Sequence, residues 1–583
     1  AFERYVSNDQ SISWSADSDM QRSDTCRRVA SYLWSDLEGL SGALYCSPAT
    51  FGSGATAERL AFNERHSITR WPERGNESFP ASYHTTINEG DVESLLGLTF
   101  LTEIEEQPVR VVQVPKTLKT PRTISVEPSY MMLRQQSIAK PLMALLEDGY
   151  LGFRSIRFKD QSKNRDLARA GSIDGSLATI DLSDASDLVS HDLVRFIFKT
   201  CPTFLQYLED SRSSRAQLPD NSIIELRKFA SMGSALCFPV EAMVFFTITL
   251  ASMVNQSGRS PSRKLLAQLS AKIAVYGDDI IVPTKMADGV MEWLEAFGLR
   301  VNHEKSFTSG FFRESCGGDY YRGQDVTPVY VRQWAPSIDT RNPRYVAACV
   351  SLSNQLYMKG LWYASQYIRD AVERKLGTFA RTIHPVGCLT WSSVSFDTGL
   401  MYDTNTSGYV VRGFTLRPQR RSDHVRDVRG GLLVAFGPQS ASRGIAQFRD
   451  DVHGYFSQHK ILRTEFRHGC PVDGSPDVSS YPASRVLRMV GSARSDLLYA
   501  QDTSGLDAPE RSGLSSTTSA YLGGQKPQRA CPESRICEKG HVPYESMAWA
   551  DPTFLRDLST SVRPYALKMK RRLVSVPHTG VQW

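Results

Sequence analysis

The chain has 583 residues, with 68 basic and 62 acidic side chains and a formal net charge of +6. This length excludes a single hydrophobic core, and 41% apolar with 22% charged residues is the composition of an ordinary globular protein. The small positive excess suits a polyanionic partner without requiring one. The ten cysteines form no dense framework, so we expect reduced thiols rather than disulfides.

Residues 1–110 mix aromatic and polar segments, which predicts globular structure but indicates no function. No apolar stretch follows Ala1, so no signal peptide is expected. The segment 111–128 is β-prone, 129–150 has a helical pattern, and 155–175 is polar and basic.

The β-prone segment carries three cations, Lys116, Lys119 and Arg122. Cations at this spacing can hold a triphosphate, and an arginine can bind it through two hydrogen bonds. A solvated basic loop explains the same residues equally well.

A short apolar segment, 178–180, runs into Asp181 and predicts a strand that ends at a carboxylate, followed by a helix. Asp181 at the strand end can help to complete a metal site. Acidic residues favour the first turn of a helix, and helix capping is the interpretation we favour for Asp184. For Asp187, capping and a functional contact fit equally.

A loop of serine and glycine, from Ser231 through Gly233, precedes the apolar stretch 236–254. Such a loop allows the backbone to approach a ligand closely, although by itself it is weak support for a site. The apolar stretch contains Pro239 and Glu241, so we expect a buried helix rather than a membrane span.

The segment 273–283 is the most informative part of the chain. Apolar β-prone runs flank Tyr276, Gly277, Asp278 and Asp279, which predicts a strand, a tight turn and a strand. Two adjacent carboxylates at the tip of a hairpin are costly unless a cation neutralises them, and hard divalent cations take oxygen ligands. The pair suits two-metal phosphoryl transfer, and the apolar flanks argue against an ordinary solvated turn.

Two further segments follow the hairpin. In 301–307, Lys305 can protonate a leaving pyrophosphate as a general acid, although a surface lysine is the default interpretation. The segment 312–321 contains Gly317 and Gly318, and either a tight hairpin against a nucleic-acid strand or a structural turn fits it.

Beyond residue 336 the pattern is mostly helical and then irregular, with 502–540 rich in Ser, Thr, Gly and Pro. Six arginines lie within 18 residues of this region. They can form either a solvated basic face or a contact with RNA phosphates. The members of this arginine cluster are Arg412, Arg417, Arg420, Arg421, Arg426 and Arg429.

The order of these segments resembles motifs F, A, B, C, D and E of viral RNA-dependent RNA polymerases. The closest resemblance is to the replicase catalytic subunit of single-stranded RNA bacteriophages, the Qβ-like leviviral family, across about 111–335. The residues that carry it are Val114-Pro115-Lys116 through Glu127-Pro128, Ala178-Thr179-Ile180-Asp181-Leu182-Ser183, Ser231-Met232-Gly233, Tyr276-Gly277-Asp278-Asp279-Ile280-Ile281, Phe312-Arg313-Glu314-Ser315-Cys316-Gly317 and Asp325-Val326-Thr327-Pro328.

The resemblance implies an α+β right-hand polymerase fold of fingers, palm and thumb, with a small antiparallel palm sheet backed by helices. The implied divisions are an N-terminal region contributing to the fingers at 1–110, fingers with a basic nucleotide-entry segment at 111–176, a palm with an interleaved fingers segment at 177–335, and a thumb with the C-terminal region at 336–583.

The resemblance also implies site residues. Asp181 and Asp278 would bind two Mg²⁺ ions with help from Asp279, and Mn²⁺ or Ca²⁺ can take the same site. Lys305 would be the general acid. The implied nucleotide-binding residues are Lys116, Lys119, Arg122, Asp187, Ser231 and Gly233.

The implied activity is primer-independent, template-directed RNA synthesis in the cytoplasm of an infected bacterium. Its partners would be the single-stranded RNA template, the nascent RNA and ribonucleoside triphosphates, with no membrane. Host elongation factors Tu and Ts and an RNA-binding ribosomal protein are further expected partners.

One departure concerns the choice of sugar. Many polymerases of this class carry Thr and Asn four and eight residues after the glycine of the third segment, where this chain has Cys237 and Glu241. Ser186, Asp187 and Ser231 are the remaining candidates for contact with the ribose 2′-hydroxyl.

Two rival classes share parts of this pattern. A reverse transcriptase has the same paired aspartates but usually a bulky aromatic residue after the first aspartate, and none follows Asp181 within 182–186. A non-catalytic RNA-binding protein with a degenerate palm would not need all three aspartates.

Overall fold

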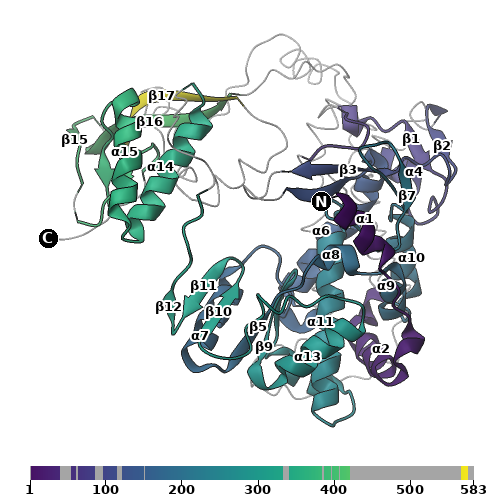
Figure 1. The fold of residues 1–583 in the computed structure, drawn as a ribbon. Coiled ribbons are helices and arrows are strands. Elements are labelled where there is room, and N and C mark those ends of the chain that lie inside the picture. The colour runs from purple at the N-terminus through teal and green to yellow at the C-terminus, as the bar shows by residue number, and fades with distance from the viewer. Residues whose placement is uncertain are drawn as a thin grey trace, which may run out of the picture. The chain divides into compact units, whose positions relative to one another are not determined.

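The computed structural model describes residues 2–39, 51, 54–60, 64–85, 96–114, 121–149, 151–331, 341–383, 386–395, 397–405, 407–419 and 566–575. These residues form two compact units, 2–327 and 328–419 with 566–575. Both units mix helices and strands (Figure 1), which confirms the mixed α and β composition. The predicted limits of fingers, palm and thumb stay predictions.

The first unit holds most of the regular structure. Its helices are α1 (Phe2–Gln10), α2 (Met20–Trp34), α4 (Ala81–Thr85), α6 (Ser129–Asp148), α7 (Ser162–Asp174), α8 (Ala185–Leu188), α9 (His191–Ile197), α10 (Pro202–Asp210), α11 (Cys237–Gln256), α12 (Arg263–Ser270) and α13 (Thr284–Ala296). Its strands are β1 (Arg70–Pro72), β2 (Thr99–Leu101), β3 (Val109–Val114), β4 (Arg122–Val126), β5 (Leu177–Ile180), β6 (Arg215–Gln217), β7 (Ile223–Glu225), β8 (Ala274–Tyr276), β9 (Asp279–Pro283), β10 (Phe312–Ser315), β11 (Gly318–Tyr321) and β12 (Gln324–Asp325).

A three-stranded antiparallel sheet, β5–β9–β8, lies at the centre of the first unit. The predicted hairpin is confirmed, because β8 and β9 pair through Tyr276 and Asp279 across a two-residue turn. Gly277 in that turn has a φ of 60°, a backbone conformation that glycine adopts without strain. The predicted strand ahead of Asp181 is β5, and it pairs with β9.

Both faces of this sheet are covered, which explains why its strands are apolar on successive residues rather than on alternate ones. Ile280 and Val282 face the large core that includes α11 and α13, whereas Ile281 faces Ala168 of α7 on the opposite side. Figure 1 shows these helices beside β5 and β9. The sheet is therefore a rigid platform for residues at its edges.

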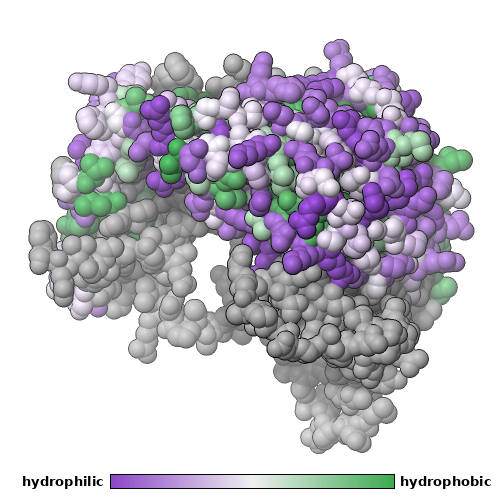
Figure 2. All heavy atoms as spheres, turned by 90° about the horizontal axis from the view of Figure 1, so that it is seen from below, coloured by the Kyte–Doolittle hydropathy of each residue, from purple (hydrophilic) through white to green (hydrophobic). Residues whose placement is uncertain are grey.

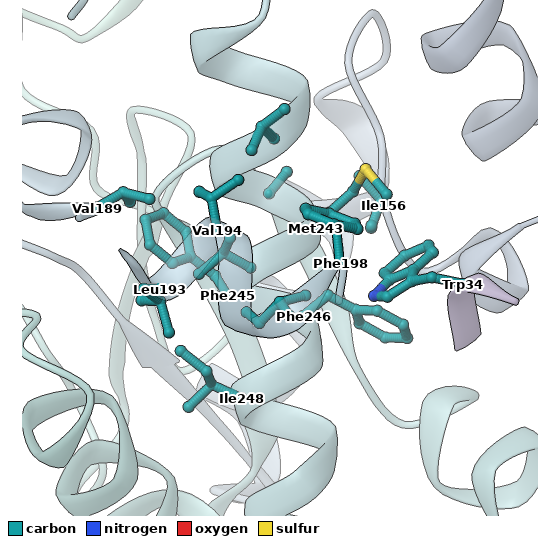
Figure 3. Packing of buried hydrophobic residues seen from close by; sticks show 14 of the residues in the cluster. Trp34, Ile156, Val189, Leu193, Val194, Phe198, Met243, Phe245, Phe246 and Ile248 are labelled. Carbon is teal, nitrogen blue, oxygen red and sulfur yellow. The ribbon is translucent and has the colours of Figure 1, made fainter. Parts of the chain in front are cut away.

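Helix α11 is a core helix, as the sequence predicts. By length and composition it could cross a membrane, but 94% of its most apolar window is buried within the structure. Figure 3 shows Met243, Phe245 and Phe246 packed among residues such as Trp34 and Phe198 from other elements. Apolar contacts surround the helix, and this accounts for its lack of a polar face.

A second sheet has the strand order β4–β3–β6–β7. The predicted β-prone segment forms its β3–β4 hairpin, with Val114 paired to Arg122. Lys116 and Lys119 lie outside the described residues. Helix α1 packs on this sheet through Tyr5, so the N-terminal region is joined to the hairpin that leads to the basic segment.

The loop from Ser231 to Gly233 docks on strand β4. The Ser125 N–H donates to the Met232 carbonyl at 2.8 Å, and Gly233 has a φ of 127°. A Cβ on Gly233 would lie 2.0 Å from the Ser125 carbonyl oxygen. The sequence predicted that the backbone of this loop can approach a ligand closely. In the structure it is strand β4 that this backbone approaches closely.

We therefore expect Gly233→Ala to destabilise the chain by about 3 kcal/mol or more, because the clash is with backbone and the φ suits only glycine. Gly310→Ala is the control, since Gly310 has a φ of 62° but open space around its Cβ position. That control should cost only about 1–2 kcal/mol. Urea unfolding of both variants measures the difference, and equal losses would contradict the close packing on β4.

The second unit contains two helices and five strands among its described residues. They are α14 (Pro343–Met358), α15 (Trp362–Leu376), β13 (Arg381–Thr382), β14 (Trp391–Ser392), β15 (Leu400–Asp403), β16 (Gly408–Gln419) and β17 (Ala566–Ser575). The helical prediction holds for α14 and α15 only. Beyond them the sequence looked irregular, yet β16 pairs antiparallel with β17 along its length from Val410 to Gln419, across about 150 residues of chain.

The second unit is strongly basic. Its described residues include thirteen lysines and arginines against four acidic residues, a net charge of +9 that exceeds the +6 of the whole chain. Arg412 and Arg417 of the predicted arginine cluster lie on β16, and the other four members lie outside the described residues. Pairing places them beside the basic run of β17, where Arg412 is opposite Leu573 and Arg417 is opposite Lys568.

The exposed surface is mainly polar on the face that Figure 2 shows, with hydrophobic residues scattered among hydrophilic ones. Scattered exposure of this kind is usual for globular proteins. Exposed aromatic residues do occur in the second unit, where Trp362 and Tyr363 at the start of α15 are 63% and 96% exposed.

Candidate active site

The three predicted aspartates meet at one edge of the β5–β9–β8 sheet. Both β5 and β8 run antiparallel to β9, so their carboxyl ends and the start of β9 share an edge. Asp181 follows β5 directly, Asp278 lies in the turn after β8, and Asp279 begins β9. The pairing of Ile180 with Ile280 places Asp181 and Asp279 in neighbouring register positions.

Residues 301–307 hold Asp181 in place. Asn302 Nδ2 donates to Asp181 Oδ2 at 2.8 Å, and the Asn302 N–H donates to the Asp181 carbonyl at 2.9 Å. The Asp181 N–H donates to Ser306 Oγ at 3.1 Å. From the sequence, only Lys305 was singled out in this segment. Asn302 and Ser306 were missed, because no local pattern shows that their side chains reach the end of a distant strand.

The β10–β11 hairpin holds Asp279. Segment 312–321 therefore forms a hairpin, and its contact with a nucleic-acid strand stays a prediction. The Cys316 N–H donates to Asp279 Oδ2 at 3.2 Å, and Cys316 and Gly317 form a turn with φ of 51° and 68°. Burial, and after it the neighbouring Asp278 carboxylate, raises the pKa of Asp279 to about 7. The hairpin is thus structural support for an aspartate.

Two further acids lie in the field of these aspartates. Burial raises the pKa of Glu241 on α11 well above its ordinary value, and Asp278 raises it further. Burial also raises the pKa of Glu314 on β10; Lys305 opposes this increase, and Asp181 and Asp278 add to it. The acids at this edge repel one another, so a bound cation would stabilise their ionised forms.

The donor set at this edge fits a hard divalent cation, because it consists of carboxylate oxygens that repel one another. Within the part of the chain that the structure describes, no three acidic, histidine or cysteine side chains converge closely enough to form a complete metal site. The prediction that Asp181 and Asp278 would hold an ion, with Asp279 beside them, stays a prediction.

The structure shows ion-pair partners for the two acids after Asp181. Asp184 occupies the N-cap position of α8 but makes no capping hydrogen bond, so our capping interpretation is wrong for its side chain. Its carboxylate pairs instead with Arg4 at 2.7 Å and Arg300 at 3.4 Å. Asp187 pairs with Lys228 at 2.9 Å, a lysine that the sequence reasoning missed.

Of the remaining predicted residues, Arg122 and Ser231 lie on or beside the second sheet, and Lys305 lies in the segment that holds Asp181. Arg122 is exposed at the start of β4. The Ser231 hydroxyl is buried and lies 2.8 Å from the Tyr5 hydroxyl, so it is engaged with α1. Lys305 is exposed, its N–H donates to the Asn302 carbonyl, and its charge lowers the pKa of Glu314.

We expect Lys305→Leu to slow the chemical step by about 10²–10⁴-fold with little change in nucleotide affinity, because it removes a proton donor beside the acidic edge. Pre-steady-state incorporation measured against pH checks this. Lys285→Leu, at an exposed position in α13, is the matched control. An unchanged rate and pH profile would leave Lys305 as a surface lysine.

Comparison with known proteins finds similar sequences. Residues 81–343 match the family described as RNA replicase, beta-chain. The RNA-directed RNA polymerase subunit beta of Qbeta virus (strain MX1) is 33% identical over 335 residues, which cover 56% of this chain and 52% of that protein. The RNA-directed RNA polymerase beta chain of Escherichia phage MS2 is 32% identical over 319 residues, covering 51% and 53% of the two chains.

These matches show which proteins the chain resembles over part of its length. Over residues 81–343 the chain is related to the replicase beta chains of RNA bacteriophages, which confirms the resemblance seen in its motifs. The chain spans about half the length of the curated relatives it matches. Among solved structures, the RNA-dependent RNA polymerase of bacteriophage phi12 gives a TM-score of 0.38 at 11% identity, covering 64% of this chain and 69% of that one.

Proposed function

We propose that this chain is an RNA-directed RNA polymerase that copies a single-stranded RNA phage genome by nucleotidyl transfer. The observation that carries the proposal is the meeting of Asp181, Asp278 and Asp279 at one sheet edge. Two separate segments brace that edge, one through Asn302 and one through Cys316. Such bracing is what precise placement of charged catalytic groups requires.

In the proposed reaction the RNA 3′-hydroxyl attacks the α-phosphate of a ribonucleoside triphosphate and pyrophosphate leaves. Two divalent ions, Mg²⁺ by preference, would supply Lewis-acid stabilisation of the attacking and leaving oxygens. Asp181 and Asp278 would hold these ions, and Asp279 would assist.

The chain's other residues would bind the substrate and move its proton. Lys116, Lys119 and Arg122 would hold the triphosphate, because clustered cations neutralise its charge. Lys305 would give a proton to the leaving pyrophosphate. Asp187, Ser231 and Gly233 would shape the nucleoside side of the site, directly or through the loop on β4.

The same proposal includes a right-hand arrangement of fingers, palm and thumb, in which the β5–β9–β8 sheet and helices α7, α11 and α13 are the palm. It places the enzyme in the cytoplasm of an infected bacterium, starting chains without a primer. Elongation factors Tu and Ts and an RNA-binding ribosomal protein are proposed partners, and co-purification from the host tests them.

The test is template-dependent incorporation. Purified chain, alone and with host extract, is given RNA template, labelled ribonucleotides and Mg²⁺, and the product is checked for complementarity. Removal of Mg²⁺ with a chelator should stop synthesis and its return should restore it. No incorporation under any of these conditions, by a chain shown to be folded, would refute the proposal and favour an RNA-binding protein.

The reverse-transcriptase alternative is tested in the same assay. Ribo- and deoxyribonucleotides are supplied separately on one RNA template. Leu182, the residue after Asp181, is a buried core residue, and no aromatic side chain stands within 182–186 to exclude a ribose. We expect ribonucleotides alone to support synthesis, and preference for deoxyribonucleotides would reverse the assignment.

A further inference from the structure

Helix α7 lies in the basic segment 155–175, and two of its arginines are used by none of the roles above. Arg165 donates to the Cys316 carbonyl twice, from Nε at 3.2 Å and from Nη2 at 3.0 Å. Arg169 Nε donates to the Gly323 carbonyl at 2.9 Å. Figure 1 shows α7 beside β10 and β11. Both guanidinium groups therefore bond to the backbone of the β10–β11–β12 sheet.

The Cys316 carbonyl belongs to the tight turn that joins β10 to β11 through Cys316 and Gly317. In a two-residue turn, the N–H and the carbonyl of the first residue lie outside the strand ladder and need other partners. Here the N–H donates to Asp279 Oδ2, and the carbonyl accepts from Arg165. The turn therefore connects a guanidinium group on α7 to a carboxylate at the sheet edge.

Helix α7 is also fixed to the strand that begins with Asp279. Asn164, next to Arg165, is fully buried, and its Nδ2 donates to the Asp279 carbonyl at 3.4 Å. Ala168 of the same helix packs with Ile281, two residues further along β9. The helix thus holds both the main chain of Asp279 and, through Arg165, the turn that bonds to its side chain.

We propose that Arg165 is a positioning residue, which holds the Cys316 turn so that its N–H fixes the Asp279 carboxylate where it assists in binding a divalent ion. This role rests on the proposed function and deepens it, because it assigns part of the metal affinity of the sheet edge to helix α7. It also gives a use inside the protein to an arginine that by its charge alone suits a surface for RNA.

The backbone of the turn explains why Arg165 is needed. Cys316 has a φ of 51°, a conformation that residues with a side chain rarely adopt. Two hydrogen bonds from one guanidinium group hold the turn in this conformation, and a turn that relaxes moves its N–H away from Asp279. The carboxylate then keeps its charge but loses its fixed orientation. Loss of a group that orients a metal ligand typically costs about 10- to 100-fold in metal affinity or activity.

The test measures metal binding directly, without RNA or nucleotide. Mn²⁺ is titrated into the folded chain, and the free ion is followed by electron paramagnetic resonance. Arg165→Ala should raise the Kd for Mn²⁺ by about 10-fold or more. Arg165→Lys keeps the charge but not the two-pronged donor, so it should raise this Kd by about 3-fold. Asp278→Asn should abolish the binding, which assigns the signal to the sheet edge.

Arg169→Ala is the matched control. It removes an arginine of the same helix that bonds to the same sheet at the opposite end of β11. It should lower the melting temperature as Arg165→Ala does, but leave the Kd for Mn²⁺ unchanged. A purely structural role of Arg165 predicts equal Kd values for the two variants, and that result would overturn the proposal.

The sign of the change separates positioning from a simple effect of charge. Removing a positive charge near a cation site lowers repulsion, so charge alone predicts tighter Mn²⁺ binding by Arg165→Ala. Positioning predicts weaker binding, and tighter binding would refute it. Where Arg165→Ala fails to fold, Arg165→Lys decides: weaker binding than wild type supports the role of Arg165, and equal binding contradicts it.

Single-nucleotide incorporation is the second readout. At saturating Mg²⁺, Arg165→Ala should lower kcat by about 10-fold with little change in the KM for the nucleotide. If wild type binds Mn²⁺ but incorporates no nucleotide, the proposed function fails, and the Mn²⁺ comparison still decides the role of Arg165. If wild type incorporates nucleotides and Arg165→Ala matches Arg169→Ala in both readouts, only the role of Arg165 is wrong. If folded wild type binds no Mn²⁺, that role is also refuted.

Discussion

Replacing Asp278 by asparagine is expected to lower nucleotide incorporation by about 10²–10³-fold or more while leaving the fold intact. The change removes a charged oxygen ligand from an edge that has to hold divalent ions. It also removes a repulsive charge beside Asp279 and Glu241, so thermal stability should not fall and can rise. Incorporation at saturating Mg²⁺, together with a melting curve, measures both effects.

Controls make the Asp278 result specific. Asp181→Asn should be equally severe, and Asp279→Asn should be milder because Asp279 is assigned a supporting role. Asp288→Asn, at an exposed position in α13, makes the same chemical change away from the sheet edge and should have no effect. Full activity of Asp278→Asn at saturating Mg²⁺ would remove the metal assignment.

The second large effect is expected for Gly277→Ala, in the turn that carries Asp278. Gly277 has a φ of 60°, where alanine is strained by about 1–2 kcal/mol. A Cβ there would lie 2.3 Å from the Phe238 ring. That ring cannot move freely, because it packs against Tyr276 and Phe158 with ring centres 5.6 and 5.5 Å apart.

Relief of this clash has to shift either the turn or the aromatic cluster. We expect Gly277→Ala to lose about 2–5 kcal/mol of unfolding free energy. Incorporation should fall by about 10²-fold, because a displacement of about 1 Å at a catalytic group has that cost. Urea unfolding and single-nucleotide incorporation are the measurements.

Gly258→Ala separates backbone strain from the clash. Gly258 has a φ of 66° and nothing within 4 Å of its Cβ position. This control should lose about 1–2 kcal/mol and keep full incorporation. Adding Phe238→Leu to Gly277→Ala should recover part of the lost stability. If the two alanine variants behave alike, Phe238 does not constrain the turn.

Local patterns were sufficient to predict the elements that carry the aspartates. The strand before Asp181, the hairpin around Gly277, strands in the β-prone segment 111–128 and the buried helix after Gly233 all form as expected. Each depends on neighbours a few residues away: a run of apolar residues, a turn glycine or the length of an apolar stretch. The candidate site was found because those signals lie next to its carboxylates.

The groups that position the carboxylates were not predictable in this way. Asn302 reaches Asp181 across 121 residues of chain, and Lys228 reaches Asp187 across 41. Asp184 looked like a helix cap because the sequence cannot show that Arg4 lies beside it, 180 residues earlier. Side-chain partners of this kind depend on which elements pack together, and no local pattern reports that.

The sequence by itself was therefore enough to identify the aspartates at the sheet edge, the strands and the turn that carry them, and the class of chemistry that they suit. These three properties follow from the periodicity of apolar residues, from turn residues and from charge. Tertiary structure alone decided that helix α1 joins the loop at Ser231 to strand β4, and that β16 pairs with β17. The physical reason is that a buried charge or an unpaired strand edge needs a bonding partner. Which residue becomes that partner depends on which distant segments of the chain folding brings together.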